Sequence, residues 1–196
     1  MRRSTLFALI ALGAIGAGFA FSSAARRFND DQGATQTSEA AGPQAVRLGW
    51  RETFGPRRGG FEFRVERFEV LADGWRADIS VKNESAVAYR VGDSRATVDR
   101  SFGIRLFSTG DADELERRNE DGTLPSLRPA RRYEPSLPDT LEPHSEWQGT
   151  MSAPGSLVAG SWVRFVFGPL VAIGRTPDDL PEGFVWTTDH AYRLHR

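Results

Sequence analysis

Hydrophobic and polar residues alternate with a period of two over most of the chain after Val46. The segment 61–70 reads FEFRVERFEV, in which hydrophobic residues alternate with charged residues as far as Val65 and resume one residue out of phase at Phe68. Successive side chains of a strand point to opposite faces of its sheet, so this pattern predicts strands with one buried and one wet face. A phase slip of one residue predicts a β-bulge between Val65 and Phe68.

A second alternating run, 75–82, follows the first after a short turn that contains Asp73 and Gly74. Two such runs around an Asp-Gly turn predict a β-hairpin. No segment after residue 27 has a convincing helical period, and Gly, Pro and Asp punctuate the short runs. The pattern therefore predicts an all-β fold, a β-sandwich or barrel. Its further strands are expected at 87–91, 102–107, 147–151, 162–167, 184–186 and 191–194.

The alternation stops between residues 108 and 140. This segment begins with the charge-dense run DADELERRNEDG and continues through LPSLRPARRYEPSLPD, which is rich in proline and arginine. A connection of this length inside a compact domain is typically functional or disordered. The other interpretation is a long charged loop that crosses the end of the sandwich in solvent, with one helical turn at 114–118.

Residues 4–25 contain no charge and lie between arginine pairs at 2–3 and 26–27. A bilayer core of about 30 Å requires roughly 20 mostly apolar residues in a helix. Two interpretations stay open: an uncut signal anchor, or a signal peptide that is cleaved with Ser22 and Ala24 at its −3 and −1 positions. Either one predicts a cytoplasmic N-terminus and an exported remainder. The protein is then a single-pass membrane protein with its domain outside the cell, or a secreted or periplasmic protein after cleavage.

Composition indicates how the chain is divided into segments and which partners are disfavoured. Residues 29–44 are polar and small, so we expect a signal anchor or signal peptide at 1–27, a flexible tether at 28–45 and one β-sandwich domain at 46–196. Removing the four arginines of residues 1–27 leaves 21 basic and 26 acidic residues, a balance that argues against nucleic acid as a partner. The chain has no cysteine, which excludes disulfides and a lipidated cysteine.

Two segments carry a resemblance to a known family. They are WRADISVKN at 75–83 and LEPHSEWQGT at 141–150, followed by Pro154 and the strand-like run 162–167. Over about 61–174 the chain resembles the bacterial exported immunoglobulin-like domain of unknown function, the type found on lipoproteins and immunoprotective extracellular proteins. The resemblance implies an immunoglobulin-like β-sandwich without assigned catalytic residues. The family's usual lipid-modified cysteine is absent here, and the first loop is longer and more basic.

Catalytic chemistry has weak support in the sequence. Gly92-Asp93-Ser94 is similar to the nucleophile block of a lipase and esterase family, but a serine nucleophile requires a base, and none of the histidines has the Asp three residues earlier that this family uses. Asp189, His190 and His195 lie close together near the C-terminus. Histidines five residues apart on a strand point to opposite faces, so we expect a solvated pair of histidines rather than a zinc site.

A calcium site in the acidic run 111–121 also fits poorly, because position six of an EF-hand-like register would be Glu116 and position twelve Gly122. We therefore expect neither a metal nor a cofactor.

Arg128, Arg131, Arg132 and Tyr133 form the one cluster of basic and aromatic residues. Arginine pairs with carboxylate or phosphate and is common in protein interfaces, so these residues are the candidate contact site for a partner. The alternative is that they pair with acids of the same segment. The preferred function is a membrane-tethered, non-enzymatic binding module whose partners are the membrane, through the N-terminal helix, and another envelope protein. The alternatives are an exported hydrolase or metal-binding protein, and a structural envelope spacer.

Overall fold

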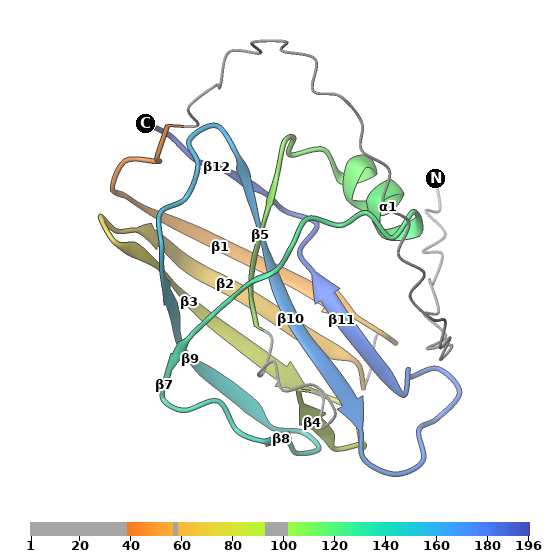
Figure 1. The fold of residues 1–196 in the computed structure, drawn as a ribbon. Coiled ribbons are helices and arrows are strands. Elements are labelled where there is room, and N and C mark those ends of the chain that lie inside the picture. The colour runs from red at the N-terminus through yellow and green to blue at the C-terminus, as the bar shows by residue number, and fades with distance from the viewer. Residues whose placement is uncertain (1–38, 57–58, 93–101) are drawn as a thin grey trace, which may run out of the picture. The chain divides into compact units, whose positions relative to one another are not determined.

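The computed structural model describes residues 39–56, 59–92 and 102–196, which form two antiparallel β-sheets packed face to face (Figure 1). The predicted N-terminal segment 4–25, most of the predicted tether and Ser94 lie outside the described residues. Within the described ranges, no helix has the length and apolar character needed to cross a membrane. The prediction of a β-sandwich-like fold is confirmed.

Each sheet has a continuous order of paired strands. Sheet 1 contains, in spatial order, β1 (Gln44–Phe54), β2 (Phe61–Val70), β3 (Gly74–Asn83), β9 (Glu146–Pro154) and β7 (Arg132–Glu134). Sheet 2 contains β6 (Arg128–Pro129), β5 (Gly103–Phe107), β10 (Trp162–Ala172), β4 (Tyr89–Val91) and β8 (Thr140–Leu141), and β11 (Gly183–Thr187) and β12 (Tyr192–Arg193) also pair with β10.

The strands β2 and β3 form the predicted hairpin, with Val70 opposite Trp75. The turn is closed by a hydrogen bond of 2.8 Å from the amide of Leu71 to the carbonyl of Gly74. The predicted bulge is also present, because the register shifts between Val65 and Arg67 and leaves Glu66 without a partner on β3. The extra residue keeps the hydrophobic residues on both sides of it pointing into the core.

The core lies between the two sheets and is rich in aromatic rings. Phe63 of β2 packs on Phe167 of β10 with ring centroids 4.9 Å apart, and Phe68 meets Phe165 edge to face at 5.4 Å. All four side chains are at most 1% exposed. Truncating one such ring to alanine typically costs about 3–5 kcal/mol, so this interface between the sheets supplies much of the stability.

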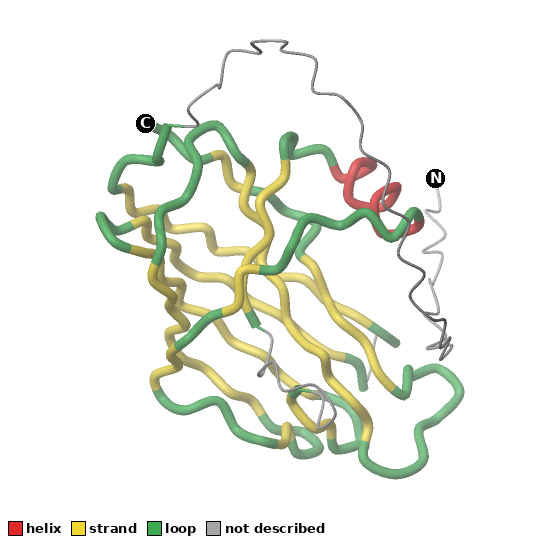
Figure 2. Tube along the Cα trace, viewed as in Figure 1, coloured by secondary structure: helices red, strands yellow, loops and turns green. Residues whose placement is uncertain are grey.

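Residues 108–140 contain secondary structure that the sequence pattern did not predict (Figure 2). A helix, α1 (Ala112–Glu120), replaces the single helical turn that was expected, and β6 and β7 follow it. Asp111 caps α1 by accepting a hydrogen bond from the amide of Asp113. Glu114 pairs with Arg117 and Arg118, one turn later on the helix. Because Glu114 is its only buried residue, α1 has no apolar stripe from which a helix could have been predicted.

Candidate functional site

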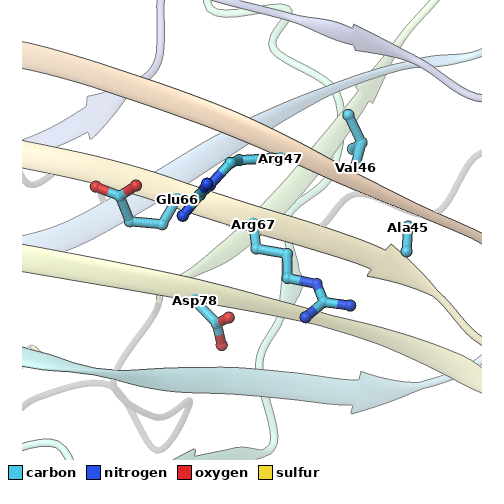
Figure 3. Close-up of a pocket in the computed structure, with 6 residues that line it drawn as sticks. All are labelled: Ala45, Val46, Arg47, Glu66, Arg67 and Asp78. Atoms are coloured by element: carbon cyan, nitrogen blue, oxygen red, sulfur yellow. The ribbon is translucent and has the colours of Figure 1, made fainter.

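The outer face of sheet 1 carries an open hollow of ≈ 450 Å³ (Figure 3). We call it the bulge hollow; it is lined by Ala45, Val46, Arg47, Glu66, Arg67 and Asp78. These residues come from three neighbouring strands, β1, β2 and β3. Four of the six side chains are charged, two of each sign.

Two adjacent bulges form this hollow. On β1 the register shifts between Arg47 and Trp50, so that two residues, Leu48 and Gly49, face the single residue Glu66 on β2. Gly49 has a φ of 60°, which glycine adopts without strain. On the other side of β2, Glu66 is itself the extra residue relative to β3. Bulges bend strands and redirect side chains, and here they do so at the same level of two neighbouring strands.

The bulge gives two consecutive residues access to the same face. In a regular strand Glu66 and Arg67 would point to opposite faces, yet both line the hollow. Figure 3 shows their charged ends extending in different directions, with Arg47 entering from β1 and Asp78 from β3. The hollow therefore offers separated positive and negative groups to a ligand.

The charges of the hollow differ in how far they are neutralised. Arg67 forms an ion pair with Glu69 at 2.5 Å, and Asp78 accepts a hydrogen bond of 2.7 Å from the hydroxyl of Thr150. Arg47 is exposed and lies directly opposite Arg67 on the neighbouring strand. No ion pair in the described part of the chain includes Arg47 or Glu66. Like charges directly opposite each other on two strands are unfavourable, and an anion bound at Arg47 would offset the repulsion from Arg67.

Two ion-pair triads flank the hollow. The carboxylate of Glu62 accepts from Arg51 and Arg64, while that of Glu69 pairs with Arg67 and Arg76. The carboxyl side chains are only 5% and 7% exposed, whereas the four arginines are 41–64% exposed. At these two triads, solvent therefore meets the guanidinium groups more than the carboxylates.

The pKa values of both carboxyls follow from these contacts. Burial by itself would raise the pKa of Glu62, but hydrogen bonds from Arg51 and Arg64 outweigh it and hold the pKa below its ordinary value. The hydrogen bond from Arg76 lowers the pKa of Glu69 against the effect of burial. Both groups are therefore more acidic than an isolated glutamate.

Part of the outer face of sheet 2, at β5 and β10, is covered by another segment of the chain. Arg105 and Arg164 lie directly opposite each other on β5 and β10, and each follows a core residue, so both point outward. Arg164 is completely buried. It donates to the carbonyl oxygens of Gly110 (3.0 Å), Asp111 (2.8 Å), Thr188 (2.9 Å) and Asp189.

We call residues 108–127 the covering segment; it includes α1 and runs across sheet 2 (Figure 1). Arg105 donates to the carbonyl oxygen of Pro125 in this segment. Gly110 allows it to lie close, since a Cβ there would be 2.5 Å from the ring of Trp162. Burial lowers the pKa of both Arg105 and Arg164, which have backbone carbonyls rather than carboxylates as acceptors.

A second polar cluster joins the two sheets at Glu52. This side chain points inward from β1 and accepts hydrogen bonds from the Trp186 indole (2.9 Å) and from the amides of Asp189 (3.1 Å) and His190 (3.0 Å). The Nδ1 atom of His190 lies 2.7 Å from the same carboxylate, and its ring stacks on Trp50 at 5.3 Å.

His190 and His195 are both exposed, which agrees with the expected solvated pair, and His190 in addition contacts the buried Glu52. Burial, followed by repulsion from Glu52, raises the pKa of Asp189. Across residues 39–56, 59–92 and 102–196, no group of three His, Cys, Asp or Glu side chains could hold a metal ion. The hydroxyl of Thr188, next to this cluster, binds backbone groups.

The predicted contact residues do not form one cluster. Arg128 is on β6 of sheet 2 and Arg132 is on β7 of sheet 1. The chain crosses from sheet 2 to sheet 1 between these strands, in the segment that contains Arg131. Arg128 donates to the carbonyl of Ser156 at 3.0 Å, and Arg132 pairs with Glu134 at 2.5 Å.

Tyr133 belongs to the interior side of sheet 1. Its hydroxyl donates to the carbonyl of Phe102 at 3.2 Å, and its ring packs near Trp147 and Phe102. Arg128, Arg131 and Arg132 are exposed. The aromatic member of the predicted cluster is therefore part of the core packing, and the arginines lie where the chain crosses between the sheets.

Comparison of the chain with family models, with curated proteins and with solved structures finds no match in any of the three. The resemblance to the exported immunoglobulin-like domain stays a prediction from the sequence.

Proposed function

We propose that this protein is a membrane-tethered, extracytoplasmic and non-enzymatic binding module, and that the outer face of sheet 1 is its contact surface. The observation that carries the proposal is the bulge hollow, in which the exposed Arg47 faces Arg67 and has no ion pair within the described residues. Arginine is enriched in protein interfaces because its planar group binds carboxylates in a defined geometry.

The exposed arginines form a larger surface around this hollow. Glu69, Arg76, Ser152 and Arg132 occupy one cross-strand row through β2, β3, β9 and β7. Arg132, a residue of the predicted contact cluster, thus belongs to the same outer face. The proposed contact surface extends from β1 across the sheet to β7.

The immunoglobulin-like assignment is supported by the pairing of the two segments on which the resemblance depends. Strands β3 and β9 pair along their whole length, with Gly74 opposite Pro154 and Lys82 opposite Glu146. The side-chain amide of Asn83 donates to the carbonyls of Leu141 (3.1 Å) and Glu142 (3.0 Å). This buried amide connects the end of one segment to the start of the other.

The proposed membrane anchor is the uncharged segment 4–25, which would hold the domain at the outer surface of the membrane. Mass spectrometry of the mature N-terminus tests it. An intact N-terminus, together with recovery of the chain in the membrane fraction, is the expected result. A mature chain that starts at Ala25 would contradict the membrane anchor and leave a secreted or periplasmic module.

Photo-crosslinking in intact cells tests the contact surface. A photoreactive amino acid would replace Ala45 or Thr53, which are exposed, uncharged positions on the outer face of sheet 1. The matched control is Arg90, an exposed position of β4 in sheet 2. We expect an adduct of defined mass from positions 45 and 53 and none from position 90. Absence of adducts from the sheet 1 positions overturns the proposal and favours the structural spacer.

A further inference from the structure

We infer that the outer face of sheet 1 recognises an acidic, extended polypeptide segment whose carboxylates bind two pairs of arginines. The inference rests on the proposed function and adds the chemistry of the partner. One pair is Arg47 with Arg67, and the other is Arg51 with Arg64. Each pair consists of residues directly opposite each other on β1 and β2.

Charge exposure indicates the sign of the partner. The two carboxylates of the flanking triads are nearly buried beneath the arginines that bind them, as the exposed fractions above show. Glu62 accepts the Nε–H of Arg64 and two N–H groups of Arg51. Glu69 pairs with one terminal nitrogen of Arg67. Each of these three arginines keeps further N–H groups for a second acceptor, because a guanidinium has five donors. Arg47 offers an incoming carboxylate the same fork geometry and forms no ion pair among the described residues.

The spacing of the pairs indicates an extended segment. Both pairs lie on β1 and β2, four residues apart on β1 with the bulge between them. At about 3.3 Å per residue, this separation is about 10–13 Å. In an extended peptide, residues i and i+4 lie on the same side about 13 Å apart. Acidic residues at i and i+4 of a bound strand would therefore each meet one arginine pair.

The acidic side chains of the hollow favour a peptide over a continuous anionic surface. Glu66 and Asp78 line the hollow beside Arg47 and Arg67 (Figure 3). A bilayer of anionic lipid would bring negative charge against these carboxylates as well as against the arginines. A peptide can place an amide or a basic group there, between its own carboxylates, and so match both signs.

Fluorescence anisotropy with the full chain in phosphatidylcholine nanodiscs tests the inference. The probe is a labelled synthetic peptide with Glu at positions i and i+4, and the control peptide has Gln at both. We expect the Glu peptide to bind, with affinity that falls as ionic strength rises, and the Gln peptide not to bind. Arg47→Gln should weaken binding about fivefold and Arg47→Glu about twentyfold, while Arg90→Gln on sheet 2 should leave it unchanged.

Several results would overturn the inference. Equal binding of the Glu and Gln peptides, or full binding by Arg47→Glu, would remove the arginine–carboxylate contact. Arg47-dependent flotation with phosphatidylglycerol vesicles, without peptide binding, would assign the surface to a membrane instead. Crosslinks from positions 45 and 53 without peptide binding would contradict the acidic chemistry alone. Absence of those crosslinks overturns the proposed function, whatever the peptide does.

Discussion

The outer faces of the two sheets use arginine in opposite ways. On sheet 1 the arginines are exposed, and Arg51 and Arg64 share the nearly buried carboxylate of Glu62. On sheet 2, Arg105 and Arg164 lie beneath the covering segment and donate to backbone carbonyls. Both sets occupy outward positions of alternating strands. Whether such an arginine is available to a partner depends on what lies over the sheet, not on the strand that carries it.

The two environments also differ in energy. An exposed ion pair contributes about 0–1 kcal/mol, because water solvates the separated charges nearly as well. A buried guanidinium that satisfies several carbonyls is costly to remove, since each carbonyl left without a donor loses about 1–3 kcal/mol. Stability should therefore depend strongly on Arg164 of sheet 2, which is buried, and weakly on the exposed arginines of sheet 1.

The largest effect is expected from Arg164→Met. This change leaves four carbonyl oxygens, on two separate segments, without their donor. We expect the free energy of unfolding in urea to fall by about 3–5 kcal/mol. Amide hydrogen exchange should also quicken in α1, because the covering segment loses its attachment at Gly110 and Asp111.

The matched control for this change is Arg193→Met, on the exposed side of β12 in the same sheet. It should change the free energy of unfolding by no more than about 0.5 kcal/mol. Equal effects of the two substitutions would contradict the distinction between covered and open arginines, and slow exchange in α1 of Arg164→Met would show that other contacts hold the covering segment.

A smaller loss is expected from Glu52→Gln. The neutral amide presents an N–H₂ group to donors that now meet a carboxylate, including the Trp186 indole and the amide of His190. The free energy of unfolding should fall by about 2 kcal/mol, measured by urea denaturation. Glu66→Gln, which changes a carboxylate of the open face without an ion pair among the described residues, is the control and should be nearly neutral. A neutral Glu52→Gln would mean that the carboxylate does not hold the sheets together.

The contributions of the two faces to folding stability should also differ in their dependence on pH. Hydrogen bonds from arginines lower the pKa of Glu62 and Glu69 in the folded state, so folding favours their ionised forms. Their contribution is present above the ordinary glutamate pKa of 4.5 and is lost as the pH falls through the lower folded values. Arg105 and Arg164 of sheet 2 bind carbonyls, which do not titrate, so these contacts add nothing to this loss.

We expect Glu62→Gln to flatten the dependence of the free energy of unfolding on pH below about 4.5, by less than about 1 kcal/mol in total. The measurement is urea denaturation at a series of acidic pH values. The control is Glu146→Gln, whose exposed carboxylate lies on β9 of the same face. An unchanged slope for Glu62→Gln would show that the triad does not favour the ionised carboxyl.

Local sequence signals were enough to predict β2 and β3, two of the three strands that form the bulge hollow, whereas β1 was not among the predicted strands. The phase slip after Val65 predicted the bulge at Glu66, and the Asp73-Gly74 turn predicted the hairpin. Both signals are short-range, because side-chain alternation and turn geometry are fixed by neighbouring residues. The signal for the candidate site was therefore visible, although its meaning as a charged hollow required the second bulge on β1.

Contacts between distant segments could not be predicted in this way. Arg105 and Arg164 occupy positions that alternation assigns to a wet face, but distant segments of the chain bury Arg164 and partly bury Arg105. Closeness in sequence also did not indicate that Arg128 and Arg132 lie on different sheets, because the chain crosses from sheet 2 to sheet 1 between them. Tyr133 points into the core because β7 pairs with β9, a partner far along the chain.

The smallest effect on stability is expected from Arg47→Gln, which removes an exposed guanidinium that has no ion pair within the described residues. The midpoint of thermal unfolding should stay that of the wild type, because the substitution breaks no internal contact and relieves repulsion from Arg67. The crosslink from position 45 should nevertheless weaken, measured as the yield of adduct in cells. If the adduct survives at full yield, Arg47 does not contact the partner. A clear drop in the unfolding midpoint would instead show that Arg47 stabilises the fold. It would contradict the expectation that the exposed arginines of sheet 1 contribute little to stability.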